Sequence, residues 1–235
     1  MTELSLAQKI ISLILKFIVM ISVTAGVIVS AMASSSAFMG GDTVFMYFTI
    51  QSNILMAIIC LIGIFLMFSN NIYNKVWHII KLVGTVSITL TGVVFCLVLA
   101  PTMAREAWTL GNILTHVIVP LSSIIDFFVV CSVMNIRKIN VLWVTVPPIL
   151  YAIYAGIGYA RGWEFLEGYN YPYFFLNWGS EAGAFGFSDS LPFMGPVWWI
   201  LILLAFLIIV GFVYLLIADA IRRRFNRKLG LSNIE

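Results

Sequence analysis

Charged residues are scarce in this sequence. Asp, Glu, Lys and Arg make up 10% of its 235 residues. The hydrophobic residues (Ala, Val, Ile, Leu, Met, Phe, Trp, Tyr and Cys) make up 62%. A soluble domain carries about 25% charged and about 45–50% apolar residues. A soluble core of this size cannot hide so many apolar side chains. The low charge therefore excludes an ordinary soluble protein and indicates that a lipid bilayer surrounds most of the chain.

Cysteines are also few. Cys60, Cys96 and Cys131 all lie inside apolar segments, and none of them forms a CxxC pair. An odd number of cysteines at membrane depth argues against both a disulfide framework and a zinc site. We interpret them as small apolar side chains in helix packing, and we expect neither a metal nor an organic cofactor.

Long apolar runs take the place of charge. A membrane-spanning helix needs about 20 mainly apolar residues, and six segments qualify. The sequence has no internal repeat and no matched pair of Pro/Gly-broken segments, which would be the usual sign of a transporter site. It predicts an all-α polytopic membrane protein in which 1–235 form a single bundle of six transmembrane helices. The predicted spans are 10–33, 46–68, 78–100, 112–134, 139–159 and 197–218, with a long outer loop at 160–196.

Lys and Arg are distributed unevenly between the two sides of a six-span chain. All but two of the 13 basic residues fall on one side: Lys9, Lys16, Lys75, Lys81, Arg137, Lys138, Arg222, Arg223, Arg224, Arg227 and Lys228. In this count Lys16 opens the first span and Lys81 flanks the second connector. The other side holds Arg105, Arg161, Asp42, Glu106, Glu164, Glu167, Glu181 and Asp189. Because cytoplasmic loops are rich in Lys and Arg, we predict that both termini are cytoplasmic.

The basic residues that follow the last predicted span are expected to contact anionic lipid as a topology anchor, rather than to bind nucleic acid.

The first predicted span has an alternative interpretation as a signal peptide. Lys9 and Lys16, an apolar run and then Ala31-Met32-Ala33 resemble a signal peptide, whose cleavage would leave five spans. The run is long enough to span a membrane, and it carries small residues on one face, so we expect it to be retained.

The fourth predicted span has a polar stripe. Asn112, His116, Ser123 and Asp126 recur at i, i+4, i+11 and i+14, which places them on one face about 100° wide. Pro120 lies beside this stripe and is expected to kink the helix. Polar side chains at membrane depth are costly, so the stripe is predicted to face the bundle and not lipid.

The second predicted span opens with a polar face formed by Thr49, Ser52 and Asn53. Thr49 lies seven residues after Asp42, and His116 lies ten residues after Glu106. Both spans enter from the outer side, so the two side chains are expected at similar depth in the outer leaflet. A hydroxyl and an imidazole that meet form a minimal nucleophile–base pair. The structural alternative is a Thr bonded to its own helix carbonyl and a His that bridges two helices.

Three further polar residues have open roles. Asn53 or Asn112 would orient the imidazole or stabilise an oxyanion. Asp126 lies about 15 Å deeper than His116 along the helix axis and cannot touch that imidazole. It is expected either to be neutral and hydrogen-bonded, or to lie in a wet cavity open to the cytoplasm. The outer loop at 160–196 is rich in aromatic residues and is expected to fold over the outer mouth of the bundle or lie among lipid headgroups.

Three motifs carry a family resemblance: Phe48-Thr49-Ile50-Gln51-Ser52-Asn53, Thr115-His116-Val117-Ile118-Val119-Pro120 and Tyr171-Pro172. They resemble a group of bacterial six-span membrane proteins that is distantly similar to the androgen-induced-protein family of eukaryotes. Members of the latter family are intramembrane hydrolases that cleave fatty acid esters of hydroxy fatty acids with a Thr nucleophile and a His. Carried over by position, the resemblance implies Thr49 as nucleophile and His116 as general base, in a bacterial plasma membrane.

Three functions therefore stay open at this point. The leading hypothesis is an intramembrane hydrolase of lipid-like carboxylic esters that draws its substrate from the outer leaflet, with membrane lipids as its partners. The second is a non-enzymatic membrane protein (a carrier, lipid-binding protein or assembly factor) in which Asp126 is the functional ionisable group. The third is an acyltransferase that uses the same Thr49 and His116 with an alcohol or lysolipid as acceptor.

Overall fold

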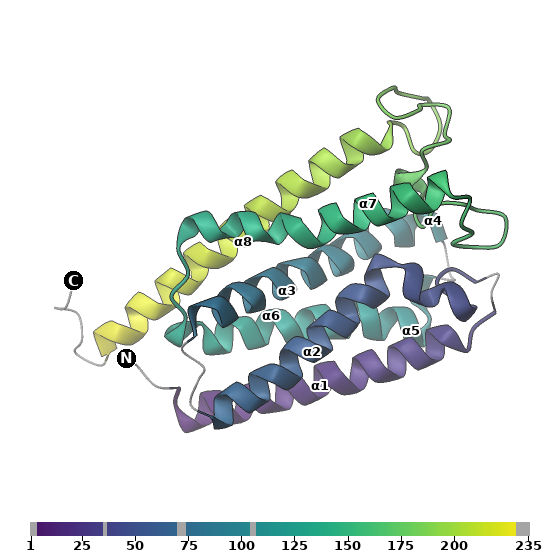
Figure 1. Cartoon of the computed structure of the whole chain (residues 1–235). Helices are drawn as coiled ribbons and strands as arrows, with labels where there is room; N and C mark the ends of the chain where they lie inside the picture. The colour runs from purple at the N-terminus through teal and green to yellow at the C-terminus, as the bar shows by residue number, and fades with distance from the viewer. Residues whose placement is uncertain (1–3, 35–36, 70–73, 104–106, 229–235) are drawn as a thin grey trace.

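The structure, a computed structural model, describes residues 4–34, 37–69, 74–103 and 107–228 as a bundle of helices (Figure 1). Six helical segments in these ranges are long and apolar enough to cross a membrane. The predicted all-α, six-span architecture is thereby confirmed. Arg105 and Glu106, which the charge count places on the outer side, lie outside the described residues.

Three of the spans are uninterrupted α-helices and three have segments of other helix types. The uninterrupted ones are α1 (Leu6–Ala31), α2 (Phe48–Phe68) and α8 (Pro196–Lys228). The third span joins α3 (Lys75–Val94), a π-helical segment (Phe95–Leu99) and α4 (Ala100–Met103). The fourth joins α5 (Leu110–Ile113), a π-helical segment (Leu114–Ile118) and α6 (Val119–Val130). The fifth joins a 3-10 segment (Lys138–Thr145) and α7 (Val146–Ala160). Short 3-10 segments also occur at Gly41–Met46, Cys131–Val133 and Phe174–Leu176.

Side-chain caps set several helix starts. Ser5 and Gln8 form a capping box at the start of α1, in which each side chain binds the other residue's backbone N–H. Asn74 accepts hydrogen bonds from two backbone N–H groups at the start of α3, and Thr109 accepts one at the start of α5. These short polar side chains satisfy N–H groups that have no partner within the helix.

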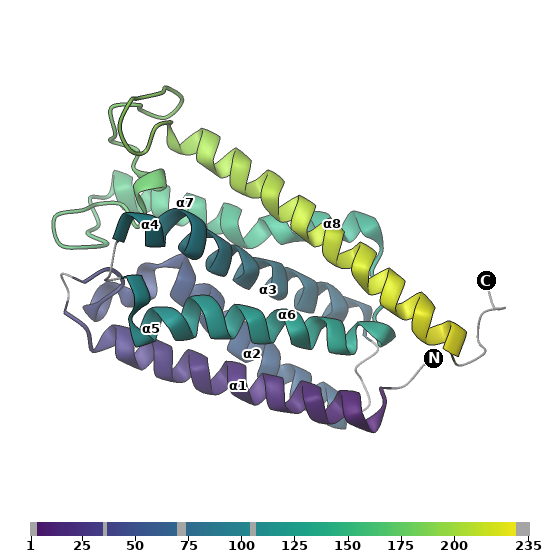
Figure 2. The same ribbon diagram turned by 180° about the vertical axis from the view of Figure 1, so that it is seen from behind.

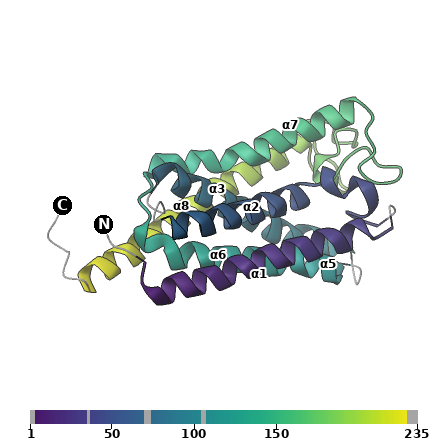
Figure 3. The same ribbon diagram turned by 60° about the horizontal axis from the view of Figure 1, so that its bottom comes forward.

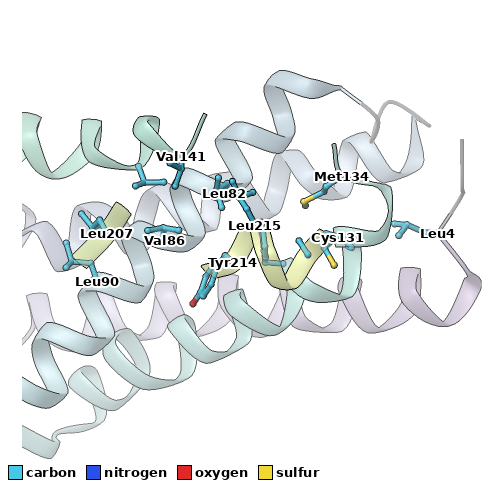
Figure 4. Packing of buried hydrophobic residues seen from close by; sticks show 14 residues of the cluster. Leu4, Leu82, Val86, Leu90, Cys131, Met134, Val141, Leu207, Tyr214 and Leu215 are labelled. Atoms are coloured by element: carbon cyan, nitrogen blue, oxygen red, sulfur yellow. The ribbon is translucent and has the colours of Figure 1, made fainter. Parts of the chain in front are cut away.

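The helices form a layered bundle with α3 and α6 in its middle (Figures 1 and 2). α1 and α2 pack on one side of this pair, and α7 and α8 lie on the other (Figure 3). The α3 span is the most buried of the six and the α8 span the least. One apolar core cluster includes Leu82 of α3, Val141 of the 3-10 segment Lys138–Thr145 and Leu207 of α8 (Figure 4). Phe127 of α6 belongs to the same cluster.

α1 begins and α8 ends at the same end of the bundle (Figure 1), as an even number of spans requires. The structure corrects two predicted boundaries. α1 begins at Leu6, before the expected position 10, and α8 continues to Lys228, ten residues beyond the predicted end at 218. The basic cluster from Arg222 to Arg227 therefore lies on α8 and not after it. Arg222 donates to the carbonyl of Met134 and pairs with Asp219 on its own helix, and both contacts extend the helix beyond the apolar run.

Candidate functional site

Thr49 lies in the first turn of α2, and its side chain is buried. Its hydroxyl oxygen is 3.2 Å from the Nε2 atom of His116, which comes from the π-helical segment of the fourth span. The second and fourth spans are therefore neighbours at this depth, and the two residues that the sequence pairs are in contact. Backbone N–H groups in the first turn carry the partial positive charge of the helix, which favours an anion close to Thr49.

The hydrogen bonds of His116 define which of its ring nitrogens carries the hydrogen. Nδ1 lies 3.0 Å from the carbonyl oxygen of Asn112, which can only accept. Nδ1 also lies 3.1 Å from the hydroxyl of Thr115, whose own hydrogen is donated to the carbonyl of Gly111. Both partners require a hydrogen on Nδ1. The neutral ring then presents Nε2 as an acceptor to the Thr49 hydroxyl, which is the arrangement a general base needs.

Two prolines account for the π-helical segments on either side of the site. Pro101 follows the segment Phe95–Leu99, and Pro120 follows the segment Leu114–Ile118, each by two residues. A proline has no N–H to give to the carbonyl four residues before it, and its ring clashes with that carbonyl. The wider π turn relieves this clash. In both cases the hydrogen bond spans five residues, from Ala100 to Phe95 and from Val119 to Leu114.

The two π-helical segments meet at the imidazole. The ring of Phe95 stacks on the ring of His116, with 3.8 Å between centroids and 18° between planes. Gly92, one turn before Phe95, lies where the third span packs closely against the fourth. A Cβ atom at Gly92 would lie 2.9 Å from the carbonyl oxygen of His116 and 3.1 Å from Cγ of Pro120. The third and fourth spans are thus held in a contact that admits only glycine at this position.

Tyr173 brings a third polar group to the site from the outer loop. Its hydroxyl oxygen lies 3.4 Å from the Thr49 hydroxyl and accepts a hydrogen bond of 3.3 Å from the Thr49 backbone N–H. Its ring stacks on Phe175 and meets Tyr47 edge-on. Burial raises the pKa of Tyr173, so its phenol stays protonated and able to donate. The outer loop therefore folds over the mouth of the bundle, one of the two placements expected.

An almost wholly apolar pocket ends at Thr49 and Tyr173. Its walls come from the third span, α7 and α8, through Leu90, Val94, Pro148, Ala152, Leu203 and Leu204. A second pocket lies beyond Tyr173, among the aromatic residues of the loop. Tyr173 and Leu99 line both pockets, so these two side chains separate them. Thr49 and Tyr173 therefore lie on the wall of the apolar pocket, and Tyr173 lies between the two pockets.

The other polar residues predicted for the site have structural contacts. The Nδ2 group of Asn53 donates to the carbonyls of Thr49 and Thr115, and that of Asn112 donates to the carbonyl of Ala107. Neither amide has an N–H group directed at the Thr49 hydroxyl. Ser52 bonds to the Thr49 carbonyl and lies 2.8 Å from the hydroxyl of Thr91. Asn53 and Ser52 thereby hold the Thr49 backbone, while the contact between Ser52 and Thr91 joins α2 to the third span.

Ser123 and Asp126 lie away from the Thr49–His116 pair. The Ser123 hydroxyl is buried without a hydrogen-bond partner among the described residues. Asp126 binds Lys16 from α1 and Lys81 from α3. The sequence interpretation of Lys16 and Lys81 as boundary charges was wrong, because both lysines are at most 3% exposed inside the bundle. Asp126 is an ion-paired carboxylate, and the alternative of a neutral, hydrogen-bonded Asp126 does not fit its two ammonium partners.

Sequence reasoning missed Tyr173 and Phe95. Tyr173 directly follows the Tyr171-Pro172 motif, so that motif marked the right part of the loop. Pro120, inside the fourth span, and Pro101, near the end of the third span, mark in the sequence the irregular turns that bring Phe95 to His116. Within the described residues, no three His, Cys, Asp or Glu side chains gather as a metal site would require.

Comparison of the chain with known proteins found no matching family model, no matching curated protein and no matching solved structure.

Proposed function

We propose that this multi-pass membrane protein is an intramembrane hydrolase of lipid-like carboxylic esters, with Thr49 as nucleophile and His116 as general base. One observation carries the proposal: the Thr49 hydroxyl lies 3.2 Å from an imidazole nitrogen that must act as acceptor. The pair stands at the end of an apolar pocket. A Thr that served only helix packing would bond to its own helix carbonyl, whereas the partners of this hydroxyl among the described residues are His116 and Tyr173.

In the first half of the reaction, Nε2 of His116 would take the proton of the Thr49 hydroxyl as the oxygen attacks the ester carbonyl carbon. The carbonyl π electrons move to its oxygen and form a tetrahedral oxyanion. When the oxyanion collapses, the bond to the alcohol oxygen breaks, and the alcohol leaves with the proton from His116. The acyl group then remains on Thr49 as an ester.

The oxyanion needs donors, and two are present beside Thr49. The Tyr173 phenol is protonated, and the Thr49 backbone N–H lies at the positive end of α2. At present the two bond to each other. An oxyanion formed next to the Thr49 hydroxyl would draw both donors to itself in a site that excludes bulk water. This arrangement takes the place of the Asn53 or Asn112 donors expected from the sequence.

The second half returns Thr49 to its starting state. His116 would take a proton from a water molecule as the water oxygen attacks the acyl carbon, and the Thr49 oxygen leaves with that proton. The product is a carboxylic acid. The pocket beyond Tyr173 provides the route for water from the outer surface, while the acyl chain occupies the apolar pocket.

The substrate would enter sideways from the membrane. The apolar pocket is lined by α7 and α8, and these two helices diverge toward the end that carries the 161–195 loop (Figure 2). With the termini placed in the cytoplasm by the charge asymmetry, that end belongs to the outer leaflet. An ester from that leaflet would reach Thr49 by this route.

Active-site labelling tests the nucleophile. A fluorophosphonate probe that reacts with activated hydroxyls should label the purified protein, and Thr49→Ala should remove the label. Thr91→Ala is the matched control, because Thr91 lines the same pocket but bonds to Ser52 and not to an imidazole. Labelling that survives Thr49→Ala would sink the nucleophile assignment. Product analysis with and without an added alcohol or lysolipid then separates hydrolysis from acyl transfer.

A further inference from the structure

A second cluster of buried ionisable groups lies deeper in the bundle, apart from Thr49 and His116. Asp126 of α6 is fully buried and pairs with Lys16 of α1 and Lys81 of α3. Ser12, one turn before Lys16, donates to the same carboxylate. Asp126 follows His116 by ten residues, which is about 15 Å along the helix axis. The proposed ester chemistry makes no use of this cluster.

The charges of this cluster do not balance. Two ammonium groups and one carboxylate carry a net charge of +1. Within the part of the chain that the structure describes, no second carboxylate lies within ion-pair distance of either lysine. A buried charge without a counter-charge costs several kcal/mol in proteins even after relaxation. The cluster therefore calls for one more negative charge.

The hydrogen bonds of the two lysines show where that charge would bind. The Lys16 ammonium directs its hydrogens to Ser12 and to both oxygens of Asp126. The Lys81 ammonium, among the described residues, donates to one oxygen of Asp126. An ammonium has three N–H donors, so two donors of Lys81 are left for a further acceptor at a site that is 2% exposed.

A small pocket adjoins both lysines. Lys16, Lys81, Trp77 and Met134 contribute to its walls, and its volume is about 10 Å³. A cavity needs about 10–15 Å³ by this measure to hold one water molecule. The pocket thus admits a single small guest. Gly63 makes room for it, because a Cβ atom there would lie 2.9 Å from Cε of Lys16 and 3.2 Å from the Trp77 ring.

We propose that Lys16, Lys81 and Asp126 form a binding site for one monovalent anion of halide size, with chloride as the natural ligand. One bound chloride would neutralise the cluster and accept hydrogen bonds from Lys81. Phosphate and carboxylate ligands are too large for the pocket. The bound ion would join α1, α3 and α6 at a depth where these helices share no other ion pair among the described residues.

The experiment is thermal unfolding of the full chain in detergent at constant ionic strength, with chloride replacing gluconate, an anion too large for the pocket. Above the dissociation constant, each tenfold rise in chloride should raise Tm of the wild type by about 3–6 °C. Lys81→Met leaves a balanced pair of Lys16 and Asp126, and its Tm should not depend on chloride. Lys75→Met is the matched control, because Lys75 is exposed on the same helix, and it should respond as the wild type does.

A wild-type Tm that is the same in chloride and gluconate would overturn the proposal. A Lys81→Met protein that keeps the full chloride response would overturn it as well. Equilibrium dialysis of the wild type with radioactive chloride needs no variant. It should give one bound ion per chain, and the absence of saturable binding would contradict the site.

Discussion

The Thr49 hydroxyl lies within hydrogen-bond distance of the His116 imidazole and of the Tyr173 phenol, and the three groups come from different parts of the chain. The hydrogen on Nδ1 of His116 is fixed by two acceptors, so Nε2 faces Thr49 as an acceptor. At the scale of single residues, the site is defined by this direction of hydrogen bonding more than by distance. An imidazole with its hydrogen on Nε2 could lie at the same distance from Thr49, but it could not accept the proton of the Thr49 hydroxyl.

Tyr173 gives the first test at this scale. Tyr173→Phe keeps the ring that stacks on Phe175 but removes the hydroxyl beside Thr49. Loss of one oxyanion donor should lower kcat by roughly 10²–10³-fold, measured as ester hydrolysis in detergent micelles. Tyr214→Phe is the control, because the Tyr214 hydroxyl is bonded to Thr89 and Tyr214 does not line the pocket at Thr49, and it should retain most activity. An unchanged kcat in Tyr173→Phe would remove Tyr173 from the reaction.

The buried ion cluster gives a second test, of stability instead of activity. Asp126→Asn leaves two buried ammonium groups without a carboxylate and should lower the free energy of unfolding by about 3–5 kcal/mol. Lys81→Met leaves one balanced pair with Lys16 and should cost less. Unfolding of both variants in detergent, followed by tryptophan fluorescence, compares them directly. A larger loss for Lys81→Met than for Asp126→Asn would contradict the charge imbalance.

At the scale of elements, the site depends on two irregular helices. The third and fourth spans each change to π-helical geometry before a proline, and these two segments place Phe95 against His116. Gly92 lets the two spans approach. An ideal α-helix through either segment would turn the following side chains to other directions, because each π turn inserts one extra residue. The outer loop completes the site by bringing Tyr173 over the start of α2.

Gly92→Ala tests this close approach. The added methyl group would meet the His116 carbonyl and Pro120, and such overpacking costs about 1–3 kcal/mol. We expect a lower Tm together with slower hydrolysis, because the fourth span must shift to relieve the clash and His116 shifts with it. Gly156→Ala in α7 is the control, since the nearest atom to its Cβ would be 4.0 Å away. Equal Tm values for the two variants would refute the packing argument.

At the scale of the whole molecule, hydropathy alone was enough to predict six spans, because a run of about 20 apolar residues has few other uses. Depth along the spans placed Thr49 and His116 at a similar level, but it did not show that the second and fourth spans are neighbours. The partners of Asp126 were not predicted, because a count of basic residues does not distinguish a lysine at a helix end from one two turns inside. Tyr173 was not predicted either, since the conformation of a long loop follows from tertiary contacts and not from a period in the sequence.

The hydrolysis of a long-chain ester by the purified protein tests the central claim most directly. The wild type and Thr91→Ala should release the carboxylic acid at similar rates, and Thr49→Ala should release none above background. His116→Gln should be slower than the wild type by roughly 10²–10⁴-fold, as expected for loss of a general base. A Thr49→Ala protein that is folded and hydrolyses the ester at the wild-type rate would contradict the account.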